Sequence, residues 1–244
     1  MYANYNDSME AGIQQPNMDQ FDAFSNKSVR LAFIRKVYGI LSLQLAITMG
    51  FVLAFTLSDE VKGFAVRNSW MLFVALGFSL VSLITLACCG VHRTYPSNLV
   101  CLGIFTLAES VMIGFTTVFR GTEIVLYAVA ITAVIVISLT LFAFQTKVDF
   151  TAFNGILFVC LMVFMLFGIL MIFIKGKTMM LIYSALGALL FSAYLVVDTQ
   201  MIVGGNHKLQ FSPEDYILGA ITLYVDIINI FIHILQLLDI ATRS

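Results

Sequence analysis

Three carboxylates lie deep inside long apolar stretches of the chain: Glu109, Asp198 and Asp226. An ionised side chain at the centre of a bilayer costs about 3 kcal/mol or more, so an acid kept there marks a functional site by default. A buried carboxyl can hold a proton, pair with a base, or offer oxygen atoms to a hard cation such as calcium. We therefore expect these three acids to carry the chemistry of the protein.

Asp198 and Asp226 are expected to face each other, because a short polar connection joins their stretches and both enter the bundle from the same end. At 1.5 Å per residue, Asp198 lies about 9 Å inside and Asp226 about 18 Å inside, so the two depths match only in part. Two carboxyls in a low-dielectric site cannot both ionise at low cost, so such a pair shares one proton. That proton would latch the two helices, and its loss would make them repel.

Two interpretations of the pair remain open from the residues alone. One is a pH-gated calcium path, with Asp198 and Asp226 as pH sensor and as calcium ligands. The other is a static polar clasp that only specifies how the helices pack. For Glu109, which shares a helical face with Thr106 and Thr116, lining of the path and pairing with a basic residue are equally open.

The last apolar stretch carries a polar stripe less than about 90° wide when it is wound at 100° per residue. The stripe consists of Asp215, Gly219, Thr222, Asp226, Asn229 and His233. Such a stripe would be costly against lipid, so it must face protein or water, and the last helix is predicted to be central. Asn229 and His233 are candidates to line an ion path. For His233, gating by protonation and a hydrogen bond within the bundle are both open.

The composition indicates that this chain is solvated by lipid. Of its 244 residues, 60% are hydrophobic and 11% are charged, and the mean hydropathy is +0.97. Soluble domains carry about 25% charged residues and about 45–50% apolar ones. A net charge of −1 gives no signal for binding polyanions, so nucleic acid is not an expected partner. Cys88, Cys89, Cys101 and Cys160 fall in or beside apolar stretches without metal-ligand spacing, and we expect buried thiols.

Seven apolar stretches follow a polar N-terminal segment, each close to the roughly 20 residues that cross a hydrocarbon core of about 30 Å. They cover residues 34–57, 70–91, 97–119, 123–145, 152–174, 178–204 and 214–238. Residues 1–30 are poor in apolar side chains and predict a disordered cytosolic tail, while residues 31–244 predict one seven-span domain. The expected fold class is an all-α membrane protein, a bundle of seven transmembrane helices with the last helix at its centre.

The orientation of the bundle follows from the basic residues at the first span. Lys27, Arg30, Arg35 and Lys36 crowd its entrance, which favours a cytosolic N-terminus. With that orientation, seven Lys and Arg residues lie in or beside the inner segments and six lie outside, so the later loops add no bias. An odd number of spans then puts the C-terminus on the opposite side.

Several segments strongly resemble the lifeguard branch of the transmembrane Bax-inhibitor-motif family, whose members are NMDA-receptor glutamate-binding-subunit-like proteins. The resemblance covers about Ser28 to Leu238, and its most specific motifs surround the two aspartates. The matching segments are Phe191–Gly205, Ser212–Tyr216 and Leu223–Phe231, with Cys88–Cys89, Arg93–Asn98 and Phe105–Thr106 in addition.

The resemblance implies a pH-sensitive calcium leak in intracellular membranes that also suppresses apoptosis. The family's aspartate pair carries over to Asp198 and Asp226. Bacterial members hold an arginine near the end of the second span that pairs with these acids, which makes Arg93 a candidate latch partner, although an interface anchor is an open alternative. The endoplasmic reticulum and Golgi are the expected compartments, with the plasma membrane and lysosome as alternatives. Calcium is expected as transported ion without any cofactor, and membrane lipid and apoptosis-regulating membrane proteins are the expected partners.

Rival classes fit the residues less well. An intramembrane aspartyl protease needs a Gly-x-Gly-Asp motif on the later helix, whereas Asp226 follows Leu223–Tyr224–Val225, so we do not expect an enzyme. A retinal protein would need a lysine in the last span, and none is present there. The serious competitor is a non-transporting protein that suppresses apoptosis by binding partners.

Overall fold

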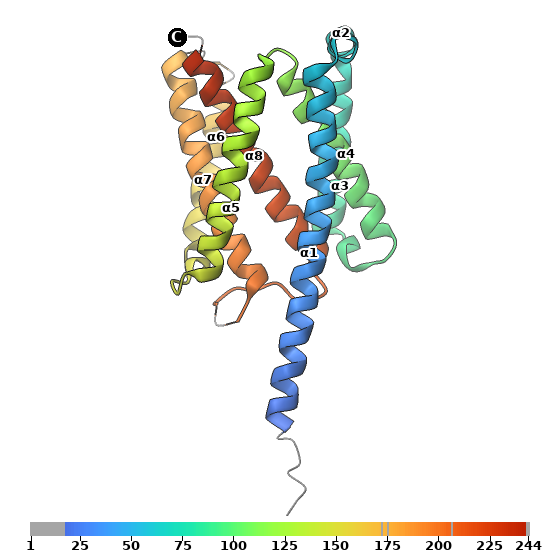
Figure 1. Ribbon diagram of the computed structural model, residues 1–244, viewed down its shortest axis with the longest axis vertical. Coiled ribbons are helices and arrows are strands. Elements are labelled where there is room, and N and C mark those ends of the chain that lie inside the picture. Colours follow the sequence, from blue (N-terminus) through green and yellow to red (C-terminus); the bar gives the residue numbers. More distant parts are fainter. Residues whose placement is uncertain (1–17, 172, 175, 206, 243–244) are drawn as a thin grey trace, which may run out of the picture.

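The computed structural model describes residues 18–171, 173–174, 176–205 and 207–242, and within these ranges the elements are all helical (Figure 1). They are α1 (Met18–Leu57), α2 (Asp59–Arg67), α3 (Trp70–Cys88), the 3₁₀ turn η1 (Val91–Arg93), α4 (Ser97–Thr117), α5 (Thr122–Gln145), the 3₁₀ turn η2 (Phe150–Phe153), α6 (Asn154–Leu170), α7 (Lys177–Val203) and α8 (Tyr216–Thr242). Seven segments of this part of the chain are long and apolar enough to cross a membrane. The predicted fold class is confirmed.

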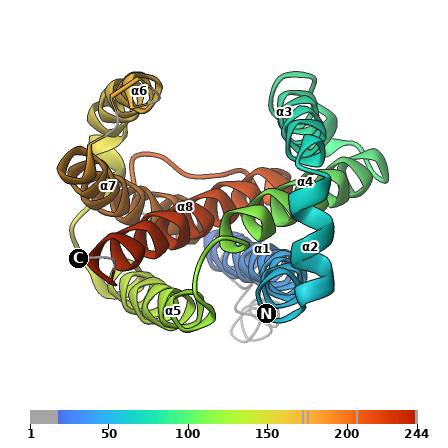
Figure 2. The ribbon, with the colours of Figure 1, turned by 90° about the horizontal axis from the view of Figure 1, so that it is seen from above.

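Helix α8 occupies the centre of the bundle, as the polar stripe predicts. It contacts α1, α4, α5 and α7, and Figure 2 shows it crossing between them while α3 and α6 lie at the periphery. In the most apolar window of α8, 67% of the residues are buried, compared with 44% for α4 and less for the other spans. Polar groups on α8 therefore face other helices, whose polar groups can satisfy their hydrogen bonds. The hydrocarbon core offers them neither water nor other hydrogen-bond partners.

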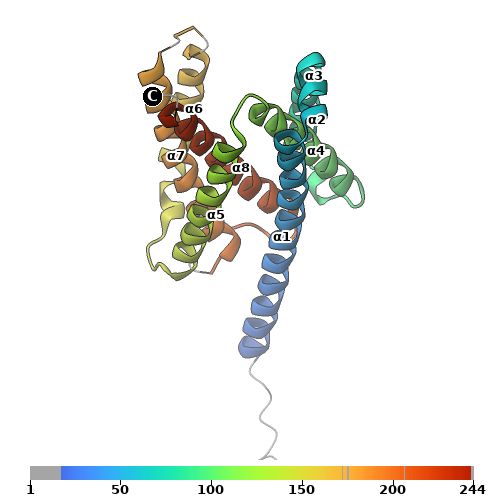
Figure 3. The same cartoon turned by 45° about the horizontal axis from the view of Figure 1, so that its top comes forward.

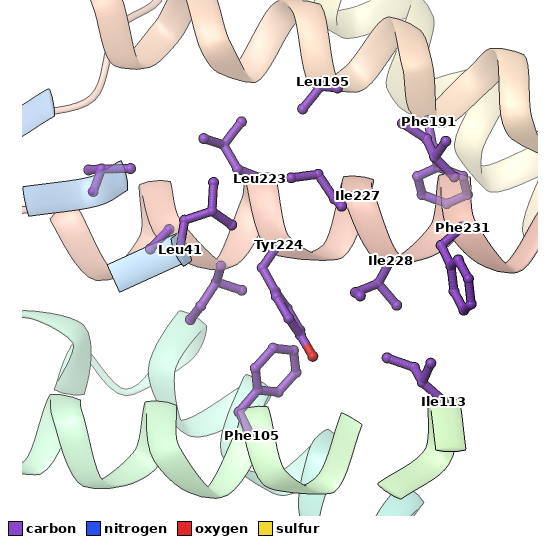
Figure 4. Close-up of a cluster of buried hydrophobic side chains, with 14 of the residues drawn as sticks. Leu41, Phe105, Ile113, Phe191, Leu195, Leu223, Tyr224, Ile227, Ile228 and Phe231 are labelled. Carbon is purple, nitrogen blue, oxygen red and sulfur yellow. The ribbon is translucent and has the colours of Figure 1, made fainter. Parts of the chain in front are cut away.

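A polar core joins α8 to α1 and α4. Tyr224 is fully buried, and its hydroxyl lies 2.8 Å from the Oγ1 of Thr48, which in turn lies 2.9 Å from the Oγ of Ser110. The Tyr224 ring meets the ring of Phe105 edge-on, with centroids 6.0 Å apart, inside a larger hydrophobic cluster (Figure 4). This combination of apolar packing and satisfied hydroxyls fixes how α8 sits against its neighbours.

Helix α1 begins at Met18, which is earlier than the sequence analysis predicts. Residues 18–30, assigned there to the disordered tail, are helical and extend α1 beyond the bundle (Figure 1), whereas residues 1–17 of the predicted tail lie outside the described residues. Adding residues to an existing helix costs far less than starting one, and no Pro or Gly occurs between Pro16 and Gly39. The boundary of the helical domain is corrected accordingly.

A short helix, α2, occupies a connection that the sequence analysis leaves without structure. The Oγ of Ser58 accepts a hydrogen bond from the amide of Val61, while Asp59 and Glu60 lie in the first turn and Arg67 in the last. These charges complement the helix dipole at both ends. Ala65 is buried, so α2 packs one face against the bundle.

Arg30 ties α1, at the point where this helix enters the bundle, to the end of α7 and to the connection that follows it. Its guanidinium donates hydrogen bonds to the carbonyl oxygens of Met201 (2.8 Å), Val203 (3.0 Å) and Phe211 (2.7 Å). Gly204 follows α7 with a φ of +65°, and a side chain there would collide with this guanidinium. A cation at a helix C-terminus also interacts favourably with the helix dipole.

We expect Arg30→Met to lower the stability of the folded bundle by about 1.5 kcal/mol, the lower end of the range for charged hydrogen bonds because Arg30 is only partly buried. The measurement is thermal unfolding of the purified protein in detergent. Arg35→Met, on the exposed part of the same helix, is the matched control. Equal losses in the two variants would contradict a specific role for the Arg30 contacts.

Candidate functional site: an acidic pair between the last two helices

Asp198 on α7 and Asp226 on α8 face each other in the most extensive helix–helix interface of the bundle. Only 8% of Asp198 and 4% of Asp226 is exposed. The carboxyl of Asp198 interacts with the side chains of Asp226 and Thr222, both on α8. The predicted contact between the two acids is therefore present, and Thr222, another member of the polar stripe, belongs to the same cluster.

The tilt of α8 explains how the acids meet despite their unequal predicted depths. Asp226 lies ten residues after the first residue of α8, or about 15 Å along that helix, whereas Asp198 lies five residues before the end of α7. Figure 1 shows α8 running obliquely across the bundle, so a given length along α8 covers less depth than the same length along α7. The two carboxyls thereby reach one level.

One oxygen of the pair, Oδ2 of Asp226, is buried without a hydrogen-bond donor among the described residues. An unsatisfied buried acceptor is costly, and a proton on the facing carboxyl would satisfy it. Tyr194, one turn before Asp198 on α7, interacts electrostatically with both acids. The geometry therefore suits a carboxyl pair that shares a proton.

The cluster offers few ligands for a tightly bound metal. Across the described ranges, no group of three or more His, Cys, Asp and Glu side chains could hold an ion. The oxygens of Asp198, Asp226 and Thr222 fall short of the six to eight that calcium prefers, so any calcium ion there would keep water or backbone ligands.

Arg93 does not pair with Asp198 or Asp226, and the candidate latch assignment is wrong in this structure. Its guanidinium contacts the carboxylate of Asp215 through Nε (2.8 Å) and a second nitrogen (3.2 Å), and the ring of His92 lies 3.5 Å from the same carboxylate. Asp215 precedes Asp226 by eleven residues, about 16 Å of helix, and Arg93 is about half exposed at the end of the bundle. The arginine is therefore too far along α8 to reach the pair.

Glu109 lies in another interface. It accepts a hydrogen bond of 2.5 Å from the Oγ of Ser79, so it sits between α4 and α3 and not beside the acidic pair. Among the described ion pairs none involves Glu109, so the structure favours neither of its two predicted roles.

The side chain of Asn229 contacts its own helix, and the ring of His233 contacts aromatic rings of neighbouring helices. The amide of Asn229 donates to the carbonyl of Val225 in its own helix (2.8 Å). The His233 ring is buried among aromatic rings of Phe164, Tyr183 and Phe191, with centroids 5.5, 5.6 and 5.9 Å away. Its Nδ1 has no hydrogen-bond partner in the described part of the chain, so this nitrogen does not make the predicted hydrogen bond within the bundle.

Contacts that the sequence analysis did not foresee fasten the α7–α8 connection below the acidic pair. Asp149, just before η2, accepts hydrogen bonds from the Thr151 hydroxyl (2.6 Å) and the Lys208 amide (3.0 Å), and the ring of His207 lies 3.2 Å away. Gln200 on α7 holds the other connection, between α5 and η2, accepting from the amide of Phe150 and donating to the carbonyl of Val148, both at 2.8 Å. Figure 3 shows the two connections on the same side of the bundle.

The hydrogen bonds from the Thr151 hydroxyl and the Lys208 amide lower the pKa of Asp149 to about 2. A lowered pKa means that its contribution to stability is complete above the ordinary value of 3.8 and is lost only as the pH falls through about 2. Asp149 therefore stays ionised at every pH where the acidic pair is to be tested.

We expect Asp149→Asn to loosen the α7–α8 connection without changing the pH dependence of any transport. Limited proteolysis should cut the connection faster in the variant, because its charged acceptor is lost. Calcium flux measured from about pH 5 to about pH 8 should keep its profile, because Asp149 does not titrate there. A flattened profile would instead place the pH sensor in this connection.

The fold and site together define a class: a seven-span helical membrane protein with an acidic pair buried between its last two helices. The family described as "Inhibitor of apoptosis-promoting Bax1" matches residues 30–243. The chain therefore belongs to this family, and the resemblance stated from the sequence is confirmed.

Individual relatives support the same assignment. The chain is 41% identical to Protein lifeguard 3 of Homo sapiens over 220 residues, which cover 88% of this chain and 70% of that protein. It is 40% identical to Protein lifeguard 3 of Mus musculus over 239 residues, covering 96% and 76%. It is 37% identical to the Golgi anti-apoptotic protein of Vaccinia virus (strain Lister) over 222 residues, covering 91% of each chain.

Proposed function

We propose that this protein is a pH-sensitive calcium leak of intracellular membranes that suppresses apoptosis. The observation that carries the transport part is the buried pair of Asp198 and Asp226 between α7 and the central helix, with one carboxylate oxygen lacking a donor among the described residues. The anti-apoptotic part is supported by the family description and by the name of the viral relative. That name also supports the Golgi as the compartment.

The pair can act as a gate because its charge state sets the force between α7 and α8. With one shared proton, the carboxyls hydrogen-bond and hold the helices together. When that proton is lost at higher pH, two negative charges face each other in a low-dielectric interface and repel. The same charges attract a divalent cation, so opening and calcium entry are favoured together. Flux is therefore expected to rise with pH.

The proposed orientation places the start of α1 in the cytosol. Lys27, Arg30, Arg35 and Lys36 lie in the N-terminal half of α1, and positive residues favour the cytosolic side. Figure 1 shows the start of α1 and the end of α8 on opposite sides of the bundle, so the C-terminal end of α8 would face the lumen. Protease protection of epitopes placed at the two ends, in sealed microsomes, tests this arrangement.

Calcium uptake into liposomes that contain only the purified protein is the decisive experiment. The expected result is a calcium leak that increases as the pH is raised. Protein-free liposomes and liposomes with the heat-denatured protein serve as controls. Absence of flux at every pH, from protein shown to be folded, would overturn the transport proposal in favour of an anti-apoptotic protein that acts only by binding partners.

A further inference from the structure

Two adjacent cysteines stand at the end of α3. Cys88 is the last residue of the helix and Cys89 is its C-cap, and Gly90, with a φ of +68°, turns the chain away. Both thiols are free and exposed, and Cys160 is exposed as well, so the expectation of buried thiols is wrong for these three residues. The reason is that α3 and α6 are peripheral helices whose outer faces meet the membrane rather than protein (Figure 2).

The space around the two thiols is open. Helix α3 packs mainly against α4 and η1, which leaves much of its surface uncovered. A side chain placed at the neighbouring Gly90 would meet no atom within 4 Å. A reagent or an enzyme approaching from the end of the bundle therefore has access to both sulfur atoms.

The depth of these thiols distinguishes them from Cys160. The apolar span of α3 ends at Cys88, which places Cys88 and Cys89 at the border between hydrocarbon and headgroups. Cys160 lies near the middle of the span Phe150–Leu170, where the surroundings are hydrocarbon. Thiols at the border can meet a water-soluble acyl donor and still deliver an attached chain to the bilayer.

An apolar groove lies along the path that a chain from Cys89 would take. It has a volume of about 370 Å³ between α3 and α4, and Val74, Phe78, Ile104 and Leu107 are among its lining residues. Phe78 precedes Cys89 by eleven residues, which puts it within about 20° of the same helical face and about 16 Å along the axis. A long-chain acyl group covers about one leaflet, or about 15 Å of hydrocarbon, so its end reaches the near part of the groove.

We propose that Cys88 and Cys89 are S-acylated with long-chain fatty acids. In the reaction the cysteine sulfur attacks the thioester carbonyl of an acyl-coenzyme A, the bond between that carbonyl and the coenzyme A sulfur breaks, and the proton of the thiol goes to the released coenzyme A. No redox change occurs. The chain on Cys89 lies along the seam between α3 and α4, with its end at the groove.

This inference rests on the proposed orientation but not on calcium transport. Acyl-coenzyme A is cytosolic, and the end of α3 that carries the cysteines lies on the same side of the bundle as the start of α1 (Figure 1). Protease protection separates the two ideas. A luminal N-terminal end of α1 would overturn both the orientation and the acylation, whereas a cytosolic end without acylation would overturn the acylation alone.

The test is exchange of thioester-linked acyl groups for a mass tag by hydroxylamine, on the full-length protein expressed in eukaryotic cells. We expect two tags on the unmodified sequence, one on Cys88→Ser and one on Cys89→Ser, and none on the double variant. Cys160→Ser, which removes another exposed thiol at mid-membrane depth, is the matched control and should keep both tags. Thermal unfolding of the purified double variant in detergent, compared with the unmodified sequence, confirms that it is folded. Absence of tags on the unmodified sequence, or tags that persist in the double variant, would overturn the proposal.

Discussion

Replacing Asp226 with asparagine is expected to abolish most of the pH dependence of calcium flux. Asparagine keeps the size of the side chain but cannot share a proton as a carboxyl does, so the coupled titration with Asp198 disappears. The remaining acid no longer faces a second negative charge, and the repulsion that opens the interface between α7 and α8 is lost. The profile should therefore flatten and not merely shift along the pH axis.

The measurement is calcium uptake into liposomes at several pH values, at equal amounts of reconstituted protein. Asp198→Asn should act like Asp226→Asn, because either change leaves a single acid. Glu109→Gln is the matched control: it also neutralises an acid within a span, but that acid bonds Ser79 between α3 and α4. An Asp226→Asn protein with unchanged flux and an unchanged profile would defeat the mechanism and leave the acids as a packing clasp.

Much of this arrangement is readable from the sequence because the membrane restricts where polar groups can go. A polar stripe on an apolar helix has to face protein, so the stripe around Asp226 is sufficient to predict that α8 is central. The short connection between the last two apolar stretches predicts that Asp198 lies against α8. The depths predicted for Asp198 and Asp226 are less accurate. The rise per residue gives the length along a helix but not the tilt of that helix, and α8 is oblique in the bundle (Figure 1).

The contacts of single long side chains were not predictable in the same way. Arg93 lies in a turn after α3, where nothing in the sequence decides between Asp215 and the deeper acids, and the direction of that turn puts its guanidinium on Asp215. The hydrogen bonds of Arg30 depend on α1 lying beside the end of α7, which is a long-range contact without a local signal. The sequence does contain a signal for helix α2. Ser58 is followed by two acids, as at the start of a helix, and Arg67 lies in the last turn.

The surroundings of His233 are less polar than its position on the polar stripe predicts. Helical spacing places His233 in line with Asp226, but aromatic rings from α6 and α7 enclose it. Its position is possible because α7 has Gly187 beside the ring, where any side chain would overlap the imidazole. The interface between α7 and α8 therefore has two parts: a charged contact at Asp198 and Asp226, and a close aromatic contact at Gly187 and His233.

Gly187→Ala is expected to destabilise the protein by about 1–3 kcal/mol, the usual cost of adding a methyl group to a filled core. The added carbon would collide with the His233 ring, which cannot move aside because Phe164, Tyr183 and Phe191 pack against it. Thermal unfolding in detergent measures the loss. Gly77→Ala, in α3 with no atom within 4 Å of the new carbon, is the matched control and should be neutral or slightly stabilising.

A double variant identifies the collision as the cause. Removing the ring with His233→Ala makes room for the methyl group, so Gly187→Ala should cost much less in that background, and the difference is the coupling energy of the pair. Equal costs in both backgrounds would show that the helices do not approach at Gly187 as described. Because Gly187→Ala changes no charge while Asp226→Asn changes almost no volume, the first should alter stability and leave the pH profile of flux in place, and the second should do the reverse.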